Sequence, residues 1–120
     1  MIKIGKNISE FSVYSCQPTT KDELKEIINR RISEQGNNCD LNDIDTSLIE
    51  DMSLLFYKSK FNGDISGWDV NDMTTMQGMF WHSEFNQDIS NWNINKKCDI
   101  SGMFKFCHIK EEYKPNTLQS

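Results

Sequence analysis

Large apolar side chains recur every 24 positions between residues 42 and 113. Three successive blocks, 42–65, 66–89 and 90–113, carry similar residues at the same offset. One block of this length cannot bury its apolar side chains alone, so we expect the blocks to stack and to share a continuous core. The mainly apolar columns are Phe56/Phe80/Phe104, Met52/Met76/Ile100, Ile44/Trp68/Trp92, Thr46/Val70/Ile94, Leu55/Met79/Met103 and Phe61/Phe85/Ile109.

The spacing inside each block predicts a short strand followed by a short helix. Trp68 and Val70 alternate with polar residues, as in a strand. Met73, Met76 and Phe80 recur at three or four residues, as on one face of a helix. We therefore predict an α/β repeat, a short solenoid of about three strand-helix units. Polar residues that favour turns recur at Asn62/Asn86, Asp64/Asp88 and Asp45/Asp69/Asn93.

The segment before the repeats predicts a helix over about 21–35. Thr20 and Glu23 form a capping-box pattern at its start, and Gly36 is suited to end it. Its apolar residues share one helix face, which we expect to cap the open end of the repeat core. These residues are Leu24, Ile27, Ile28 and Ile32.

The length of 120 residues suits a single domain over 1–120. Residues 1–18 are predicted to form an N-terminal strand or extended segment, and residues 19–36 the capping helix. The repeat solenoid spans 42–110. The polar stretch 111–120 is predicted to be a mobile tail.

Two segments resemble a known family. FNGDISGWDVNDMTTMQGMF (61–80) and FNQDISNWNINKKCDISGMF (85–104) are similar to the BspA-type leucine-rich repeat of bacterial surface proteins, also described as the mycoplasma lipoprotein-type repeat. The family pattern is F-N-x-D-I-S-x-W-x-V, then M-x-x-M-F, and the resemblance covers about 42–109. It implies a leucine-rich-repeat-like solenoid, a role in adhesion or protein recognition, and no enzymatic activity. The first and third blocks depart from the pattern, as terminal repeats commonly do.

Charge and hydropathy narrow the class of partner and the compartment. The net charge of −5 argues against a broad nucleic-acid surface and leaves a basic protein partner open. Neither a secretory signal nor an apolar stretch long enough to span a membrane is visible in the sequence. We expect a cytoplasmic protein, although the family resemblance leaves the cell surface open.

Candidate chemistry is sparse. The four cysteines lie at scattered positions without a C-x-x-C pair, so we expect reduced thiols that serve in packing. Cys98, Cys107 and His108 could approach one another, and Asp64 and Asp88 could stack, but neither set has the ligand pattern of a zinc or calcium site. Phosphate-binding, dinucleotide-binding and nucleophile motifs are missing. We expect neither an enzyme nor a cofactor.

The sequence therefore predicts a non-enzymatic protein-protein interaction module, a monomer or a homodimer. The two positions after the inward Phe column are 57 and 58 in the first block and their equivalents in the other two. We expect the aromatic residues at these positions to face outward and to bind a partner. A second candidate surface is an acidic ridge on the strand side. Two alternatives remain open: a phage or mobile-element inhibitor of a host defence complex (anti-CRISPR-like) that acts by direct binding, and a fragment of a bacterial surface adhesin. The candidate partner-binding residues are Trp81, Tyr57, His82, Phe106, Asp45, Asp69 and Asp72.

Overall fold

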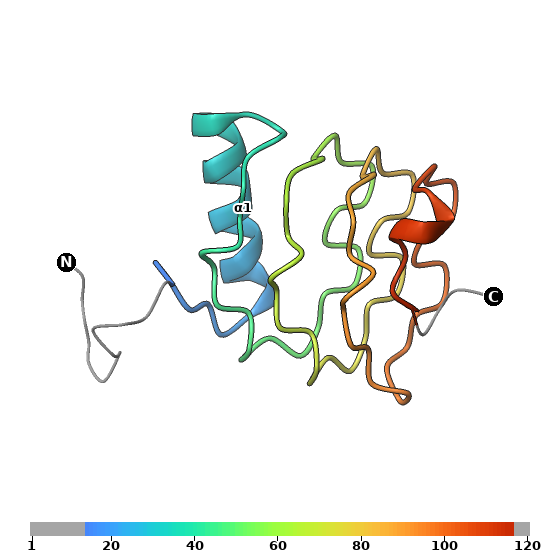
Figure 1. The fold of residues 1–120 in the computed structure, drawn as a ribbon. Coiled ribbons are helices and arrows are strands. Elements are labelled where there is room, and N and C mark those ends of the chain that lie inside the picture. Colours follow the sequence, from blue (N-terminus) through green and yellow to red (C-terminus); the bar gives the residue numbers. More distant parts are fainter. Residues whose placement is uncertain (1–13, 117–120) are drawn as a thin grey trace.

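The computed structural model describes residues 14–116 and places one helix beside a stack of irregular coils (Figure 1). Among these residues it has one α-helix, α1 (Lys21–Gln35), and one short 3-10 helix, η1 (Glu111–Tyr113). We call residues 42–65, 66–89 and 90–113 the first, second and third coils. α1 lies against the first coil, and η1 lies in the third, at the far end of the stack.

The predicted helix is confirmed, since α1 begins and ends where the sequence indicates. The Glu23 N–H donates to Thr20 Oγ1 at 3.2 Å, and the Glu23 carboxylate accepts the N–H of Thr19 at 2.7 Å. Gly36 ends the helix with a φ of 91°, and its N–H donates to Ile32 O. The predicted strand over 1–18 falls mostly on residues 1–13, which lie outside the described residues.

Aromatic side chains 24 residues apart are stacked, as the period predicts. The rings of Phe56 and Phe80 lie 5.6 Å apart at 6°, and those of Phe80 and Phe104 lie 5.5 Å apart at 1°. Phe61 and Phe85 form a second, parallel stack with centroids 6.3 Å apart. Ring stacking of this kind adds to the free energy gained by burying the rings. The core is therefore a set of aromatic and aliphatic columns that runs through all three coils.

The predicted fold class, an α/β leucine-rich-repeat-like solenoid of strand-helix units, is wrong. Among residues 14–116, α1 and η1 are the helices, and β pairing is limited to isolated parallel bridges. The bridges join Cys16 with Ile44, Asp51 with Thr75, and Thr75 with Asp99. The coils are stacked, but each of them is built from turns.

The spacing that predicted a helix in each block arises from a series of turns. The Met79 N–H donates to Met76 O, and the Trp81 N–H donates to Gly78 O, both at 3.1 Å. Gly78 and His82 have left-handed φ values of 59° and 57°, which interrupt a right-handed helix. The chain bends repeatedly around the core, and for this reason it buries residues that lie three apart: Met73, Met76 and Met79.

The spacing that predicted a strand has a similar origin. Trp68 and Val70 are buried and Asp69 between them is exposed, as in a strand. The backbone nevertheless turns on both sides: the Trp68 N–H donates to Ile65 O at 3.1 Å, and the Asn71 N–H donates to Asp69 Oδ1 at 3.0 Å. The alternation of buried and exposed residues therefore shows which side chains face the core. It does not imply that neighbouring strands are paired.

The polar columns close the turns and tie neighbouring coils together. Asp64 and Asp88 accept the N–H groups of Ser66 and Ser90 two residues ahead, both at 2.9 Å. The Asn86 N–H donates to the side chain of Asn62 in the preceding coil at 2.7 Å. These contacts agree with the turn-forming role predicted for the Asn and Asp columns.

Residues 111–116, which the sequence assigns to a mobile tail, make backbone contacts with the second and third coils. The Ile89 N–H donates to Tyr113 O at 3.0 Å, and the Asn116 N–H donates to Ser90 O at 3.2 Å. Residues 117–120 lie outside the described residues. The predicted mobility of this segment stays a prediction.

Along one side of the stack, alternate backbone N–H groups donate from each coil to the carbonyls of the next. These bonds measure 2.8–3.0 Å, so the two ladders are regular. In the first ladder, Met52, Leu54, Phe56 and Lys58 donate to Thr75, Gln77, Met79 and Trp81. In the second, Met76, Gly78, Phe80 and His82 donate to Asp99, Ser101, Met103 and Lys105.

Two main-chain carbonyls on the outer side of the first coil accept hydrogen bonds from lysine side chains of α1. Lys21 Nζ donates to Ser53 O at 3.2 Å, and Lys25 Nζ donates to Leu55 O at 2.9 Å. These carbonyls are the first-coil equivalents of Gln77 O and Met79 O, which accept backbone N–H groups in the ladder. α1 therefore closes the acceptor end of the stack.

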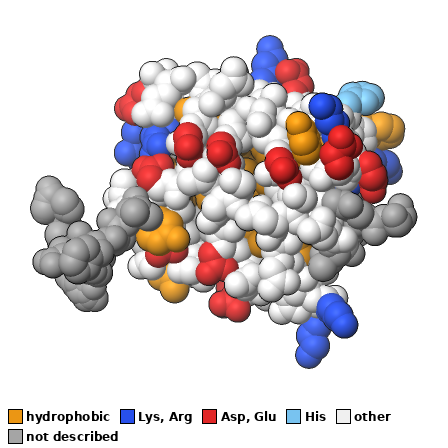
Figure 2. All heavy atoms as spheres, in the orientation of Figure 1, with side chains coloured by type: hydrophobic (Ala, Val, Ile, Leu, Met, Phe, Trp, Pro, Cys, Tyr) orange, Lys and Arg blue, Asp and Glu red, His pale blue; other side chains and the backbone are white. Residues whose placement is uncertain are grey.

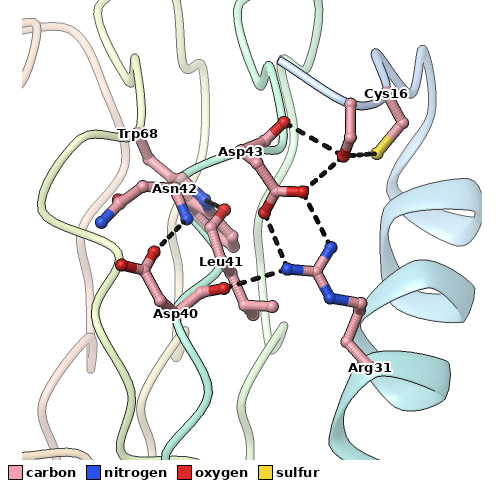
Figure 3. A network of polar contacts seen from close by, with 8 residues as sticks. Cys16, Arg31, Asp40, Leu41, Asn42, Asp43 and Trp68 are labelled. Carbon is pink, nitrogen blue, oxygen red and sulfur yellow. Dashed lines mark hydrogen bonds and ion pairs between the residues drawn. The ribbon is translucent and has the colours of Figure 1, made fainter. Parts of the chain in front are cut away.

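Arg31 fastens the last half of α1 to the start of the first coil (Figure 3). Its guanidinium donates two hydrogen bonds to Asp43, at 3.0 and 2.7 Å, and a third to Asp40 O at 3.0 Å. Asp43 also accepts the hydroxyl of Ser15. The hydrogen bonds from Arg31 lower the pKa of the Asp43 carboxyl.

Candidate partner-binding surface

Four of the predicted partner-binding residues lie together and form what we call the aromatic cluster: Tyr57, Trp81, His82 and Phe106. The ring centroids of Tyr57 and Trp81 are 5.3 Å apart, those of Trp81 and His82 6.0 Å, and those of His82 and Phe106 4.8 Å. Tyr57 is 38% and Phe106 62% exposed. The cluster crosses all three coils on the outside of the stack.

A repeated backbone conformation turns these side chains outward. Lys58, His82 and Phe106 occupy one column and have φ values of 55°, 57° and 58°. Left-handed φ values are uncommon for residues other than glycine, so three in register indicate that stacking imposes the same corner on each coil. The residues directly before these corners form the neighbouring column Tyr57, Trp81 and Lys105. The aromatic side chains of the two columns therefore lie side by side.

Trp81 is the most enclosed member of the cluster. The residue is half-buried, and its indole Nε1 is buried with no hydrogen-bond acceptor among residues 14–116. A buried donor without an acceptor costs about 1–3 kcal/mol. The indole N–H is thus an unsatisfied donor inside the cluster.

A hollow of about 280 Å³ lies beside Trp81. Gly78 keeps it open, since a Cβ atom there would lie 2.8 Å from Leu54 Cδ2 and 3.5 Å from Trp81 Cε3. Residues of all three coils line the hollow. Its lining residues are Leu54, Gln77, Gly78, Trp81, Ser101, Gly102 and Lys105.

Lysine side chains lie against the aromatic cluster. Lys58 Nζ lies 5.3 Å from the ring centroid of Tyr57, and Lys105 Nζ lies 5.6 Å from that of Phe106. Both distances suit a cation–π contact. Two ammonium groups therefore lie at the cluster, although the net charge of the chain is −5.

The acidic ridge of Asp45, Asp69 and Asp72 is mainly a set of turns. Asp45 accepts the Gln17 side chain at 2.8 Å, and Asp69 accepts the N–H of Asn71 at 3.0 Å. Asp69 and Asp72 are exposed, and Asp45 is half-buried. Figure 2 shows acidic side chains spread over the visible face of the coils. A partner-binding role of this ridge stays a prediction.

The cysteines and histidines are dispersed over the described residues. Four cysteines are free thiols, and Cys107 Sγ lies 3.3 Å from Phe85 O, to which it donates. Burial raises the pKa of the Cys39, Cys98 and Cys107 thiols. Among residues 14–116, no group of three His, Cys, Asp or Glu side chains is placed to hold a metal ion.

The sequence did not point to the hollow or to the lysines that cap the first coil. The column Leu54/Gly78/Gly102 carries the relevant signal, because all three residues have left-handed φ values of 57°, 59° and 64°. Two glycines in one column of a repeat indicate such a conformation. The capping by Lys21 and Lys25 depends on main-chain carbonyls, which have no sequence signal of their own.

Comparison with known proteins gives one family. Residues 23–113 match a family described as a mycoplasma protein of unknown function, DUF285. The match includes most of α1 and all three coils, and it supports the mycoplasma part of the resemblance. No curated protein and no solved structure matches the chain. Within the described part of the chain, no helix is long and apolar enough to cross a membrane.

Proposed function

The chain belongs to the mycoplasma protein family of unknown function DUF285, and from this premise we propose that it is a non-enzymatic module that binds a protein partner through the aromatic cluster. The observation that carries the proposal is the exposure of Tyr57 and Phe106 around the half-buried Trp81. Tyr, Trp and Phe are enriched in the centres of protein interfaces, where a few of them supply most of the binding free energy.

The surroundings of the cluster support a protein ligand. The hollow beside Trp81 has both apolar and polar side chains in its lining, as interface pockets do. Lys58 and Lys105 favour a ligand segment that carries acidic or carbonyl oxygens nearby. A host-defence inhibitor and a surface adhesin fragment are the alternatives to this proposal, and each would also act by binding a partner.

Affinity capture with matched variants tests the proposal. Trp81→Ala and Phe106→Ala remove rings from the cluster, and Leu48→Ala serves as control because Leu48 is 50% exposed and lies beside the start of α1. We expect Trp81→Ala to weaken the binding of a captured protein by about 30-fold or more. Leu48→Ala should leave this affinity unchanged.

Circular dichroism and thermal unfolding check that each variant is folded. A partner that binds wild type, Trp81→Ala and Phe106→Ala equally well would contradict the proposal, since the cluster would then contribute nothing to its recognition.

A further inference from the structure

The backbone ladder ends in four N–H groups that have no acceptor among residues 14–116. We call these groups the donor edge: Ile100, Gly102, Phe104 and Phe106. They occupy the same columns as the eight donors of the two ladders. Gly102 and Phe106 share the left-handed φ values of Gly78 and His82, so their N–H groups point away from the second coil as the earlier donors point toward the next coil.

Carbonyl groups do not accompany these donors. The carbonyls of Ile100, Gly102 and Phe104 accept the N–H groups of Met103, Lys105 and Cys107 within the third coil, at 3.0–3.2 Å. The carbonyls at the intervening residues accept the ladder bonds from the second coil. The edge therefore offers donors alone, unlike the edge of an ordinary β-sheet, where N–H and C=O groups alternate.

A donor-only edge selects its ligand. A regular β-strand would bring its own N–H groups against those of the edge, and these would find no acceptor. A proline-rich extended segment avoids this conflict, because proline has a carbonyl but no N–H. Such a segment also suits aromatic surfaces, on which its rings pack.

The edge adjoins the aromatic cluster and the hollow. Phe106 belongs to both the edge and the cluster, and Gly102 lines the hollow beside Trp81. The indole N–H of Trp81 is buried and is therefore not part of this surface. Main-chain donors and aromatic rings are thus neighbours through Gly102 and Phe106.

A second copy of the chain does not supply the missing acceptors. Two of the outer carbonyls of the first coil already accept Lys21 and Lys25 of α1, so head-to-tail stacking would require α1 to move. Tail-to-tail pairing would place donors against donors. Neither arrangement of two copies therefore pairs the donor edge.

We infer that the donor edge, together with the aromatic cluster, is a docking site for a proline-rich extended segment of a partner protein. The inference rests on the proposed function and specifies the chemistry of the partner. The prolines pack on Tyr57, Trp81 and Phe106, while main-chain carbonyls of the segment accept the N–H groups of the edge.

Titration of the full chain with a decaproline peptide, followed by NMR, tests this ligand class. A glycine-serine peptide of equal length is the control. We expect decaproline to shift the amide signals of Gly102, Phe104 and Phe106 and the indole signal of Trp81, and the control to leave them in place. If decaproline leaves these signals unmoved, or if both peptides shift them equally, the inference is wrong.

A single-donor variant sharpens the test. Ligation at Cys98 permits replacement of Phe104 by phenyllactic acid, which keeps the side chain and substitutes an ester oxygen for the N–H. This replacement should weaken decaproline binding by about tenfold, the effect of one hydrogen bond. Unchanged affinity would overturn the assigned contact.

The outcomes separate this inference from the proposed function. Loss of partner capture in Trp81→Ala without decaproline binding would keep the interaction module and remove the proline-rich ligand. Shifts of the edge amides that depend on protein concentration, without peptide, would indicate a second copy on the edge and would contradict the inference.

Discussion

Lys25 donates a 2.9 Å hydrogen bond from its ammonium group to the main-chain carbonyl of Leu55. The equivalent carbonyl in the second coil, that of Met79, accepts the N–H of Phe56 at the same distance. A lysine of α1 thus takes the place of the backbone donor that a preceding coil would provide. Lys21 and Lys25 thus satisfy two outer carbonyls of the first coil, while the third coil presents four N–H groups that have no acceptor among residues 14–116.

Removal of the Lys25 ammonium should destabilise the fold. Lys25→Met keeps the length and apolar stem of the side chain but leaves the Leu55 carbonyl without this donor. We expect the free energy of unfolding to fall by about 1–2 kcal/mol. Urea denaturation measures it, with the exposed Lys60→Met as control. Equal stability of the two variants would show that the cap contributes nothing.

Two glycines should respond to substitution by different amounts. A Cβ atom on Gly63 would lie 1.9 Å from the carbonyl oxygen of Cys39 and 2.8 Å from Phe61 Cε1, whereas a Cβ on Gly102 would meet no atom within 4 Å. Gly63→Ala should cost about 3 kcal/mol or more, because backbone must shift.

Gly102→Ala should cost about 1 kcal/mol through its left-handed φ alone. Thermal unfolding of both variants compares the costs. The reverse order of stability would contradict the packing of the Cys39 carbonyl against Gly63.

Substitution of the outermost ring of the Phe56/Phe80/Phe104 stack should destabilise the fold less than substitution of the middle ring. Phe80 has a stacked ring on both sides, and Phe104 has one on the side of the second coil. We expect Phe80→Ala to lower the free energy of unfolding by about 3–5 kcal/mol. Phe104→Ala should cost clearly less, since Phe104 is only half-buried. Chemical denaturation of the two variants gives the comparison; similar losses would argue against the stack order.

Acid should weaken the attachment of α1. The hydrogen bonds from Arg31 hold the pKa of Asp43 below its ordinary value of 3.8. A carboxyl with a lowered pKa in the folded state stabilises the fold at pH values above the unfolded-state pKa, and this contribution disappears as the pH falls through the folded-state pKa.

The free energy of unfolding should therefore fall less between about pH 5 and pH 2 in Asp43→Asn than in the wild type. Asp72→Asn is a suitable control, because the Asp72 carboxylate is exposed. Stability measured against pH by urea denaturation decides the matter. Parallel curves for wild type and Asp43→Asn would count against the coupling to Arg31.

The sequence predicted the side-chain pattern better than the backbone. Thr20, Glu23 and Gly36 marked the ends of α1 because capping depends on local residue identity. The Phe56/Phe80/Phe104 column predicted stacking because large apolar side chains must be buried together. The secondary structure inside each coil was mispredicted, since repeated turns bury residues at the same intervals as a helix face.

Part of the candidate site was also predicted from the side-chain pattern. Tyr57, Trp81, His82 and Phe106 follow from the register of the inward Phe column, which fixes the neighbours as outward. The donor edge could not be predicted, because N–H groups are common to nearly all residues. Their availability depends on which carbonyls the turns of the third coil already use.

Amide hydrogen exchange of the Phe column tests the central claim, a stack whose backbone ladder ends in N–H groups without an acceptor among residues 14–116. In the first two coils, the N–H groups of Phe56 and Phe80 donate to the next coil. The claim predicts slow exchange at Phe56 and Phe80 and exchange at least about tenfold faster at Phe104. Exchange at Phe104 as slow as at Phe80 would contradict it, because the end of the ladder would then already be paired.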